Sequence, residues 1–163
     1  MGRALVALAL LSFIAPSPAL AQQAGWQYSP YPGEGDRAAL GCAYQSTPEI
    51  HTCIAVRCED DFSVALYIDT KRLGGDGGRW RLEIDEATHE VVATPVANSP
   101  YGARIEGEVG SIIEAIKNGV SLYLDPLDGN PLTRNGIGLA GSLYAINQAL
   151  YFCAPDVPQD GTE

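Results

Sequence analysis

The first 21 residues constrain this chain more than any other feature. Arg3 gives a short basic start, residues 4–14 form an almost wholly apolar run, and residues 19–21 (Ala-Leu-Ala) have the small-x-small pattern of a signal-peptidase site. An uncleaved anchor is the less favoured alternative, because spanning a bilayer takes about 20 apolar residues. We therefore expect residues 1–21 to be a signal peptide, cleaved near Ala21, and the mature chain to be periplasmic or secreted.

Export would place the four cysteines where disulfides persist. Cys42, Cys53, Cys58 and Cys153 permit three pairings. We favour Cys42–Cys53 with Cys58–Cys153, because Cys42 and Cys53 flank a predicted hairpin turn at residues 47–48 and would face each other. In the chain-entropy model the short loop contributes about 3 kcal/mol and the long one roughly 4–5 kcal/mol. Cys53–Cys58 with Cys42–Cys153 is the alternative.

Metal or redox chemistry is a weak alternative for these cysteines. The sequence has no Cys-x-x-Cys pair, and its two histidines, His51 and His89, lie far from cysteine pairs. A hydrolase triad is equally poorly supported, because no Gly-x-Ser-x-Gly elbow occurs and Ser142 is better explained as a helix N-cap. We expect no catalytic residue, no cofactor and no metal site.

The charge balance excludes several classes of partner. The chain has 20 acidic and 10 basic residues, and losing Arg3 with the signal peptide would change its formal net charge from −10 to −11. Binding nucleic acid or anionic lipid requires a basic surface, so neither is expected. No later apolar stretch approaches membrane-spanning length, so no membrane insertion of the mature chain is expected.

The hydrophobic pattern predicts a mainly β fold. Alternation is clearest where Trp80, Leu82 and Ile84 point one way and the charged residues between them point the other. About eight strands and two short helices favour an antiparallel β-sandwich or barrel. The first helix, at residues 111–118, should bury Ile112, Ile113 and Ile116, and the second, from Ser142 onwards, is predicted from the spacing of Leu143, Ile146, Leu150 and Cys153. We list the expected strands as 25–29, 38–44, 51–57, 62–69, 79–85, 89–96, 103–108, 120–124 and a short one around 137–139.

The size of the mature chain fits a single domain. We expect residues 22–153 to form one disulfide-linked β domain with its own core. Residues 154–163 are polar and contain two prolines, so they are expected to be a disordered tail.

Acidic residues supply the only candidates for acid–base chemistry. Glu59, Asp60 and Asp61 form the one acidic run, and Asp125 and Asp128 lie in a proline- and glycine-rich loop. Paired carboxylates of this kind could serve an envelope hydrolase acting on glycans or peptides, which is our alternative hypothesis. The Asp125–Asp128 loop lacks the spacing and the distant glutamate of a calcium loop, and its composition is typical of a turn.

Aromatic residues near the mature N-terminus could form a recognition patch. Trp26, Tyr28 and Tyr31 lie close together in sequence. Packing into the core and the sheet edge explains them equally well.

The mature chain resembles small exported bacterial proteins of the invasion-associated locus B family and type VI secretion accessory periplasmic proteins. The features that carry the resemblance are Trp26, Cys42, Arg57-Cys58 ahead of the strand 62–69, the strand 80–85, the segment 138–146 and the final Cys153. The segment 138–146 fits a "Leu-x-Gly-Ser-x-x-Ala-(Leu/Ile)" close, and Cys53 is additional to the pattern. The resemblance implies a periplasmic β-sandwich with no assigned enzymatic activity. We expect an exported, non-catalytic domain that binds a protein or cell-envelope component.

Overall fold

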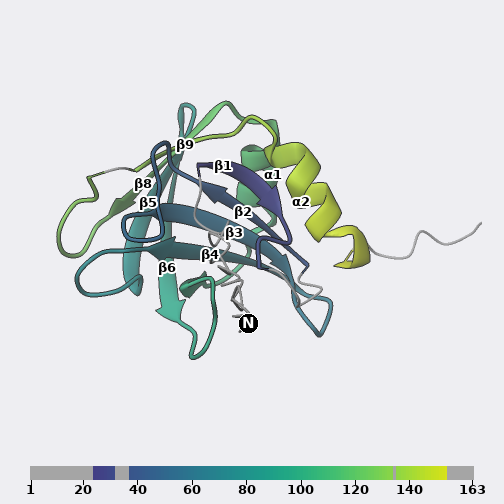
Figure 1. Cartoon of the computed structure of the whole chain (residues 1–163), viewed down its shortest axis with the longest axis horizontal. Helices are drawn as coiled ribbons and strands as arrows, with labels where there is room; N and C mark the ends of the chain where they lie inside the picture. The colour runs from purple at the N-terminus through teal and green to yellow at the C-terminus, as the bar shows by residue number, and fades with distance from the viewer. Residues whose placement is uncertain (1–23, 32–36, 134, 154–163) are drawn as a thin grey trace, which may run out of the picture.

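A computed structural model of the chain describes residues 24–31, 37–133 and 135–153 (Figure 1). The expected signal peptide and C-terminal tail lie outside these residues. The elements in the described part are β1 (Gly25–Tyr28), β2 (Ala38–Cys42), β3 (Thr52–Cys58), β4 (Val64–Thr70), β5 (Gly78–Ile84), β6 (Ala87–Pro95), β7 (Ala103–Ile105), α1 (Gly110–Asn118), β8 (Ser121–Pro126), β9 (Gly136–Gly138), α2 (Ser142–Ala149) and the 3-10 turn η1 (Tyr151–Cys153).

These nine strands form one sheet in the order β1-β2-β3-β4-β7-β6-β5-β8-β9, and every pairing is antiparallel. The sheet is nearly closed and barrel-like. The expected mainly β, antiparallel fold with two short helices is confirmed, and of the two predicted forms the structure takes the barrel.

Alternation along the strands builds the core. In β5, Trp80, Leu82 and Ile84 are buried while Arg79 and Glu83 are exposed, as the period-two pattern predicts. The barrel closes over these inner side chains together with those of β3, β4 and β8. Because one face of each strand is apolar, only one register keeps the charged residues in water.

One side-chain contact joins the two ends of the sheet. The indole Nε1 of Trp26 in β1 donates a hydrogen bond to the carbonyl oxygen of Gly138 in β9, at 3.0 Å. The Trp26 ring lies over Gly41 of β2, where a Cβ atom would collide with it. The small residue at position 41 therefore lets the tryptophan fill the seam.

The prediction holds for the buried face of α1 but fails at the N-terminus of α2. α1 buries Ile112, Ile113 and Ile116, as expected. In α2 the N-cap is Gly141, with φ of +91°, so the predicted N-cap role of Ser142 is wrong. None of the helices in the described residues has the length and apolar character needed to cross a bilayer.

The phase of α2 also differs from the prediction. Its buried residues are Ser142, Ala145, Ile146 and Ala149, a spacing of three, four and seven residues that defines one helix face. Leu143 was expected on this inner face but is 49% exposed. The Ser142 hydroxyl donates to the carbonyl oxygen of Ile116 at the end of α1, and this contact sets which face of α2 points inward.

The strand predicted over residues 62–69 starts two residues late. Phe62 is exposed and has a φ of +64° in a turn, and β4 begins at Val64. Asp61 accepts a hydrogen bond from the Ser63 backbone, which stabilises the turn in place of a strand.

Both disulfides have the favoured pairing. Cys42 and Cys53 face each other across β2 and β3, with Cα atoms 4.1 Å apart. Cys58 at the end of β3 joins Cys153 in η1, with Cα atoms 5.6 Å apart. The second bond attaches the C-terminal helical segment to the sheet across 95 residues of sequence.

Candidate functional site

The structure does not bring the two histidines into a catalytic arrangement. His51 is buried just before β3, and its Nε2 lies 3.2 Å from Asp69 Oδ1. Burial opposes the charge of the imidazole, but the hydrogen bond and the charge of Asp69 outweigh it and raise the pKa of His51. His89 lies on β6, in another part of the sheet, where its Nε2 has no partner among the described residues.

Each acidic residue of the run 59–61 already has a partner. Glu59 accepts from Arg57 at 2.6 Å, and Asp60 lies 3.3 Å from Arg37. Hydrogen bonds from Ser63 lower the pKa of Asp61. A general acid requires the opposite shift, so Asp61 does not fit that role.

The two acidic candidates in the loop, Asp125 and Asp128, also have hydrogen-bond partners within the protein. Asp128 accepts from the backbone and the guanidinium of Arg79, and Asp125 accepts from the side chain of Asn135. In the described parts of the chain, no group of three or more His, Cys, Asp or Glu residues could hold a metal ion. The faint calcium-loop pattern at residues 125–130 is therefore explained by a turn that carries an exposed ion pair.

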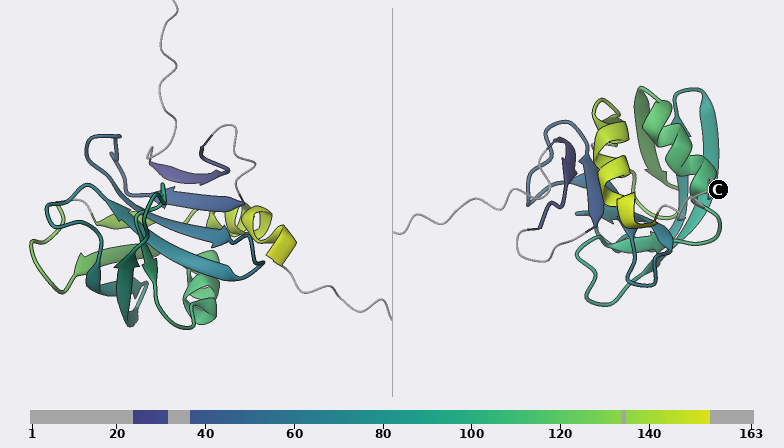
Figure 2. Two further views of the ribbon diagram at one scale, coloured as in Figure 1. Left: turned by 90° about the horizontal axis from the view of Figure 1, so that it is seen from below. Right: turned by 90° about the vertical axis from the view of Figure 1, so that its right-hand side faces the viewer.

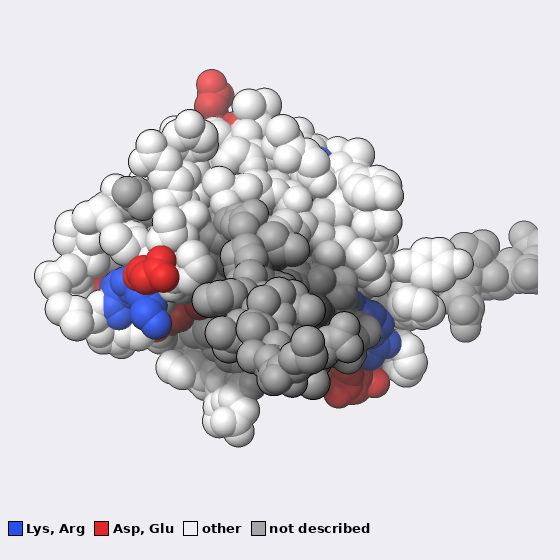
Figure 3. All heavy atoms as spheres, viewed as in Figure 1, with Lys and Arg blue, Asp and Glu red and all other residues white. Residues whose placement is uncertain are grey.

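The most distinctive surface is one without charge. The segments 24–31, 38–48 and 136–153 contain no Asp, Glu, Lys or Arg, in a chain that is 18% charged. The sheet order and the packing of α2 on β1 and β2 bring these segments together. The two views of Figure 2 show α2 beside these strands, and the side of the molecule that carries α2 is almost entirely white in Figure 3. We call this surface the charge-free face.

Aromatic and aliphatic side chains project from the charge-free face into solvent. Tyr144 is 71% exposed and Tyr151 is 73% exposed, which is unusual for side chains of this size. They border a shallow groove of about 690 Å³. The residues that line it are Tyr28, Gly141, Leu143, Tyr144, Asn147, Gln148, Tyr151 and Phe152.

The groove is held from below by the packing of α2. Ala145 and Ala149 are small, so the helix approaches β2 closely and the larger side chains are left on its outer face. The Gln148 amide donates to the Tyr144 hydroxyl at 3.0 Å, which fixes the ring orientation. Tyr151 and Phe152 pack edge to face with ring centroids 5.2 Å apart.

The three aromatic residues predicted as a possible recognition patch have separate roles. Trp26 fills the seam of the barrel, and Tyr28 lines the groove. Tyr31 packs on Tyr101 in a different part of the molecule. The sequence prediction missed Tyr144 and Tyr151, and the signal that could have found them is the absence of charge from residue 136 to residue 153.

Comparison with known proteins gave one similarity. No protein-family model matches the chain, and no curated protein matches it either. Among solved structures it is similar to invasion associated protein B from Bartonella henselae, with 18% sequence identity over 72% of this chain and 94% of that chain, and a TM-score of 0.41. This similarity agrees with the weak resemblance to the invasion-associated locus B family that the sequence suggested. The resemblance to type VI secretion accessory proteins stays a prediction.

Proposed function

We propose that this chain is an exported, non-catalytic domain that binds another protein through its charge-free face. In this proposal residues 1–21 are a signal peptide removed near Ala21, residues 22–153 form the mature domain and residues 154–163 are a tail. The two disulfides fit a protein that works in an oxidising, extracytoplasmic compartment.

The observation that supports binding is the combination of exposed aromatic rings with missing charge. Soluble domains ordinarily have about 25% charged residues, and most of these lie on the surface. The central part of protein–protein interfaces is depleted of charged residues and enriched in tyrosine, phenylalanine and tryptophan. The groove around Tyr144 and Tyr151 has both properties, and no charged residue lines it among the described ones. Tyrosine is also one of the residue types that dominate binding energy at such interfaces.

Charge favours a different protein as the partner over a second copy of this chain. The mature chain would have a net charge of −11, so two copies approaching each other repel over long range. A partner protein whose contact surface is apolar, and which is neutral or basic elsewhere, would not be repelled by this acidic chain. The exposed amides of Asn147 and Gln148 add hydrogen-bonding groups at the rim of the groove.

Site-specific photo-cross-linking tests the proposal. A benzoylphenylalanine replaces Tyr144 on the charge-free face and, as a matched control, Glu83 on the exposed side of β5, in cells that export the protein. We expect a single adduct with another protein from position 144 and none from position 83. The partner is then identified by mass spectrometry, purified, and bound to the isolated domain in vitro. Equal labelling at both positions, or an adduct of two copies of this chain only, would contradict the proposal.

Export is tested separately. The intact mass of protein recovered from the cell envelope is expected to correspond to a start near Gln22, with no alkylatable thiol before reduction. A retained residue 1, or four reactive cysteines, would show that the chain is not processed and oxidised as proposed.

A further inference from the structure

A second cleft lies apart from the groove that Tyr144 and Tyr151 border. It opens between the ends of β3 and β4 and the segment 96–101 that connects β6 to β7, and its volume is about 610 Å³. Its lining side chains include Tyr31, Arg57, Glu59 and Tyr67, and none of its lining residues borders the groove of the charge-free face. We call it the tyrosine cleft.

Three tyrosines from three segments form its aromatic part. Tyr31 packs edge to face on Tyr101, with ring centroids 5.4 Å apart, and Tyr67 lies 6.1 Å from Tyr101. The Tyr31 hydroxyl donates to the carbonyl oxygen of Pro100 at 3.1 Å, which ties the first segment to the loop. The Ser99 hydroxyl accepts a hydrogen bond from the backbone N–H of Tyr101, which also stabilises the loop.

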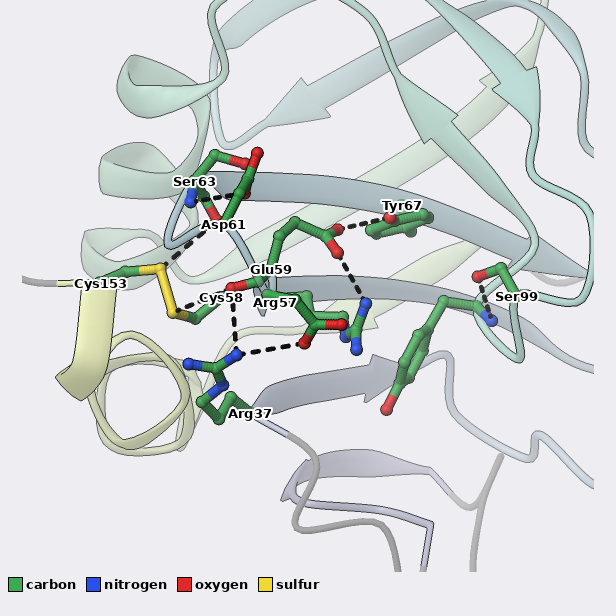
Figure 4. A network of polar contacts seen from close by, with 11 residues as sticks. Arg37, Arg57, Cys58, Glu59, Asp61, Ser63, Tyr67, Ser99 and Cys153 are labelled. Atoms are coloured by element: carbon green, nitrogen blue, oxygen red, sulfur yellow. Dashed lines mark hydrogen bonds and ion pairs between the residues drawn. A yellow bond between two sulfur atoms is a disulfide. The ribbon is translucent and has the colours of Figure 1, made fainter.

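The polar part of the cleft is a compact, neutral network. Glu59 accepts from Arg57 at 2.6 Å and from the Tyr67 hydroxyl at 2.5 Å, as Figure 4 shows. Burial and the hydrogen bond to Glu59 raise the pKa of Tyr67 to about 12, so its hydroxyl keeps its proton under ordinary conditions. Within this network the charges of Arg57 and Glu59 compensate each other, and both side chains are only partly exposed. Arg104, opposite Tyr67 on β7, adds a positive charge nearby.

One buried group in the wall of the cleft has no partner. Tyr101 is 1% exposed, and its hydroxyl oxygen forms no hydrogen bond with any described residue. Buried hydroxyl groups are nearly always hydrogen-bonded, because an unpaired one loses its contact with water and gains nothing. The described residues supply no partner for this hydroxyl in the wall of the cleft, which leaves it available to a group that enters the cleft.

We propose that the tyrosine cleft binds a neutral sugar ring. Such a ring has an apolar face that packs on an aromatic side chain, here that of the half-buried Tyr31, since Tyr67 and Tyr101 are 4% and 1% exposed. Its hydroxyls donate to carboxylates and accept from guanidinium and phenol groups. An anionic ligand would have to compete with Glu59 for Arg57, and a cationic one would have to compete with Arg57 and Tyr67 for Glu59. The paired network thus favours an uncharged ligand with several hydroxyls.

Titration of the folded mature domain tests the inference. The probes are N-acetylglucosamine, its β-1,4-linked dimer and maltose, with glucuronate and glucosamine as charged counterparts, followed by amide chemical shifts in NMR. At about 10 mM, where even a weak site is occupied, at least one neutral sugar should give saturable shifts around Tyr67 and Tyr101. The dimer distinguishes a site for a glycan chain from a site for a single sugar. Absence of saturable shifts with every neutral sugar, or stronger binding of a charged counterpart, would overturn the inference.

Two variants separate a binding role from a structural one. Tyr101→Phe removes only the unpaired hydroxyl, so the fold should keep its full stability while the affinity for the sugar falls about tenfold. Glu59→Gln should lower the affinity by at least as much. Tyr144→Ser, on the charge-free face, is the control and should leave sugar binding unchanged. Wild-type affinity in Tyr101→Phe would show that the hydroxyl does not contact the ligand and would overturn the inference for this cleft.

Discussion

The charge-free face and the sheet formed by β5, β6 and β8 bury similar side chains but present opposite chemistry to solvent. On β5 the outward positions are charged or small, and its two arginines are paired: Arg79 with Asp128, and Arg81 with Glu90. On α2 and η1 the outward positions are Leu143, Tyr144, Tyr151 and Phe152. Burial in the core explains the inner residues of both regions equally well. What sets the charge-free face apart is that several large apolar side chains gather there without any charge, a combination typical of a contact surface.

The two regions also differ in the contacts that attach them to the rest of the fold. The β5–β6 hairpin is paired along seven residues of each strand, and its outer edges pair with β8 and β7. The C-terminal segment with α2 and η1 has no strand ladder of its own and depends on helix packing, the Ser142–Ile116 hydrogen bond and the Cys58–Cys153 disulfide. The following predictions test this difference, in order of expected effect.

The largest effect is expected from removing the long-range disulfide. Cys58→Ala with Cys153→Ala should lower the free energy of unfolding by about 4–5 kcal/mol, because the bond closes a loop of almost 100 residues. The matched control, Cys42→Ala with Cys53→Ala, opens a much shorter loop and should cost about 3 kcal/mol. Urea unfolding without reductant measures both. A smaller loss for the 58–153 variant than for the 42–53 variant would show that the C-terminal segment does not depend on its disulfide.

A smaller but clear effect is expected in the seam beside the charge-free face. Gly41→Ala would place a methyl group inside the Trp26 ring and should destabilise the fold by about 1–3 kcal/mol. Gly138→Ala, in the strand on the other side of the seam, adds its methyl group to open space and should change stability by less than about 1 kcal/mol. Thermal unfolding followed by circular dichroism compares them, and equal melting temperatures would contradict the packing described for Trp26.

A pH-dependent effect is expected at His51, directly after the hairpin that ends the charge-free segment 38–48. The folded state raises the pKa of His51 above its ordinary value of 6.5, so the protonated side chain stabilises the fold. This stabilisation is complete below about pH 6.5 and is lost as the pH rises through the pKa of the folded state. His51→Gln should therefore be less stable than wild type at about pH 5.5 and closer to it at about pH 8.5. His89→Gln is the control, and a difference that grows towards high pH would contradict the sign.

The smallest effect is expected on the charged side. Asp128→Asn removes the exposed partner of Arg79, and Glu90→Gln removes that of Arg81. Exposed ion pairs of this kind contribute little, because water and salt screen them. Neither variant should change the unfolding midpoint measurably, and neither should affect partner binding. A marked loss in either would mean that this surface has a role beyond solubility.

The sequence predicted the strands best where one face is core and the other is water. The alternation around Trp80 and Leu82 is a local property, so it needed no knowledge of the rest of the fold. The phase of α2 was wrong at Leu143 because a long-range contact, from Ser142 to Ile116, determines it. Phe62 was assigned to a strand because hydrophobic alternation does not register a turn stabilised by Asp61.

The candidate surfaces were harder to predict than the fold. The favoured cysteine pairing followed from hairpin geometry, since Cys42 and Cys53 are equidistant from the turn. The groove and the tyrosine cleft combine residues from segments far apart in sequence, such as Tyr28 with Tyr151 and Tyr31 with Tyr101. Periodicity describes one segment at a time, so it cannot show that these side chains meet.

Affinity for the purified partner tests the role of the charge-free face most directly. Tyr144→Ser and Tyr151→Ser should each raise the dissociation constant at least about tenfold, because exposed tyrosines at an interface carry much of the binding energy. Tyr123→Ser removes a tyrosine of β8 that is 44% exposed on the charged side, and it should leave the dissociation constant within about twofold of wild type. Equal losses for all three variants, or no loss for Tyr144→Ser and Tyr151→Ser, would contradict the assignment of this face as the binding surface.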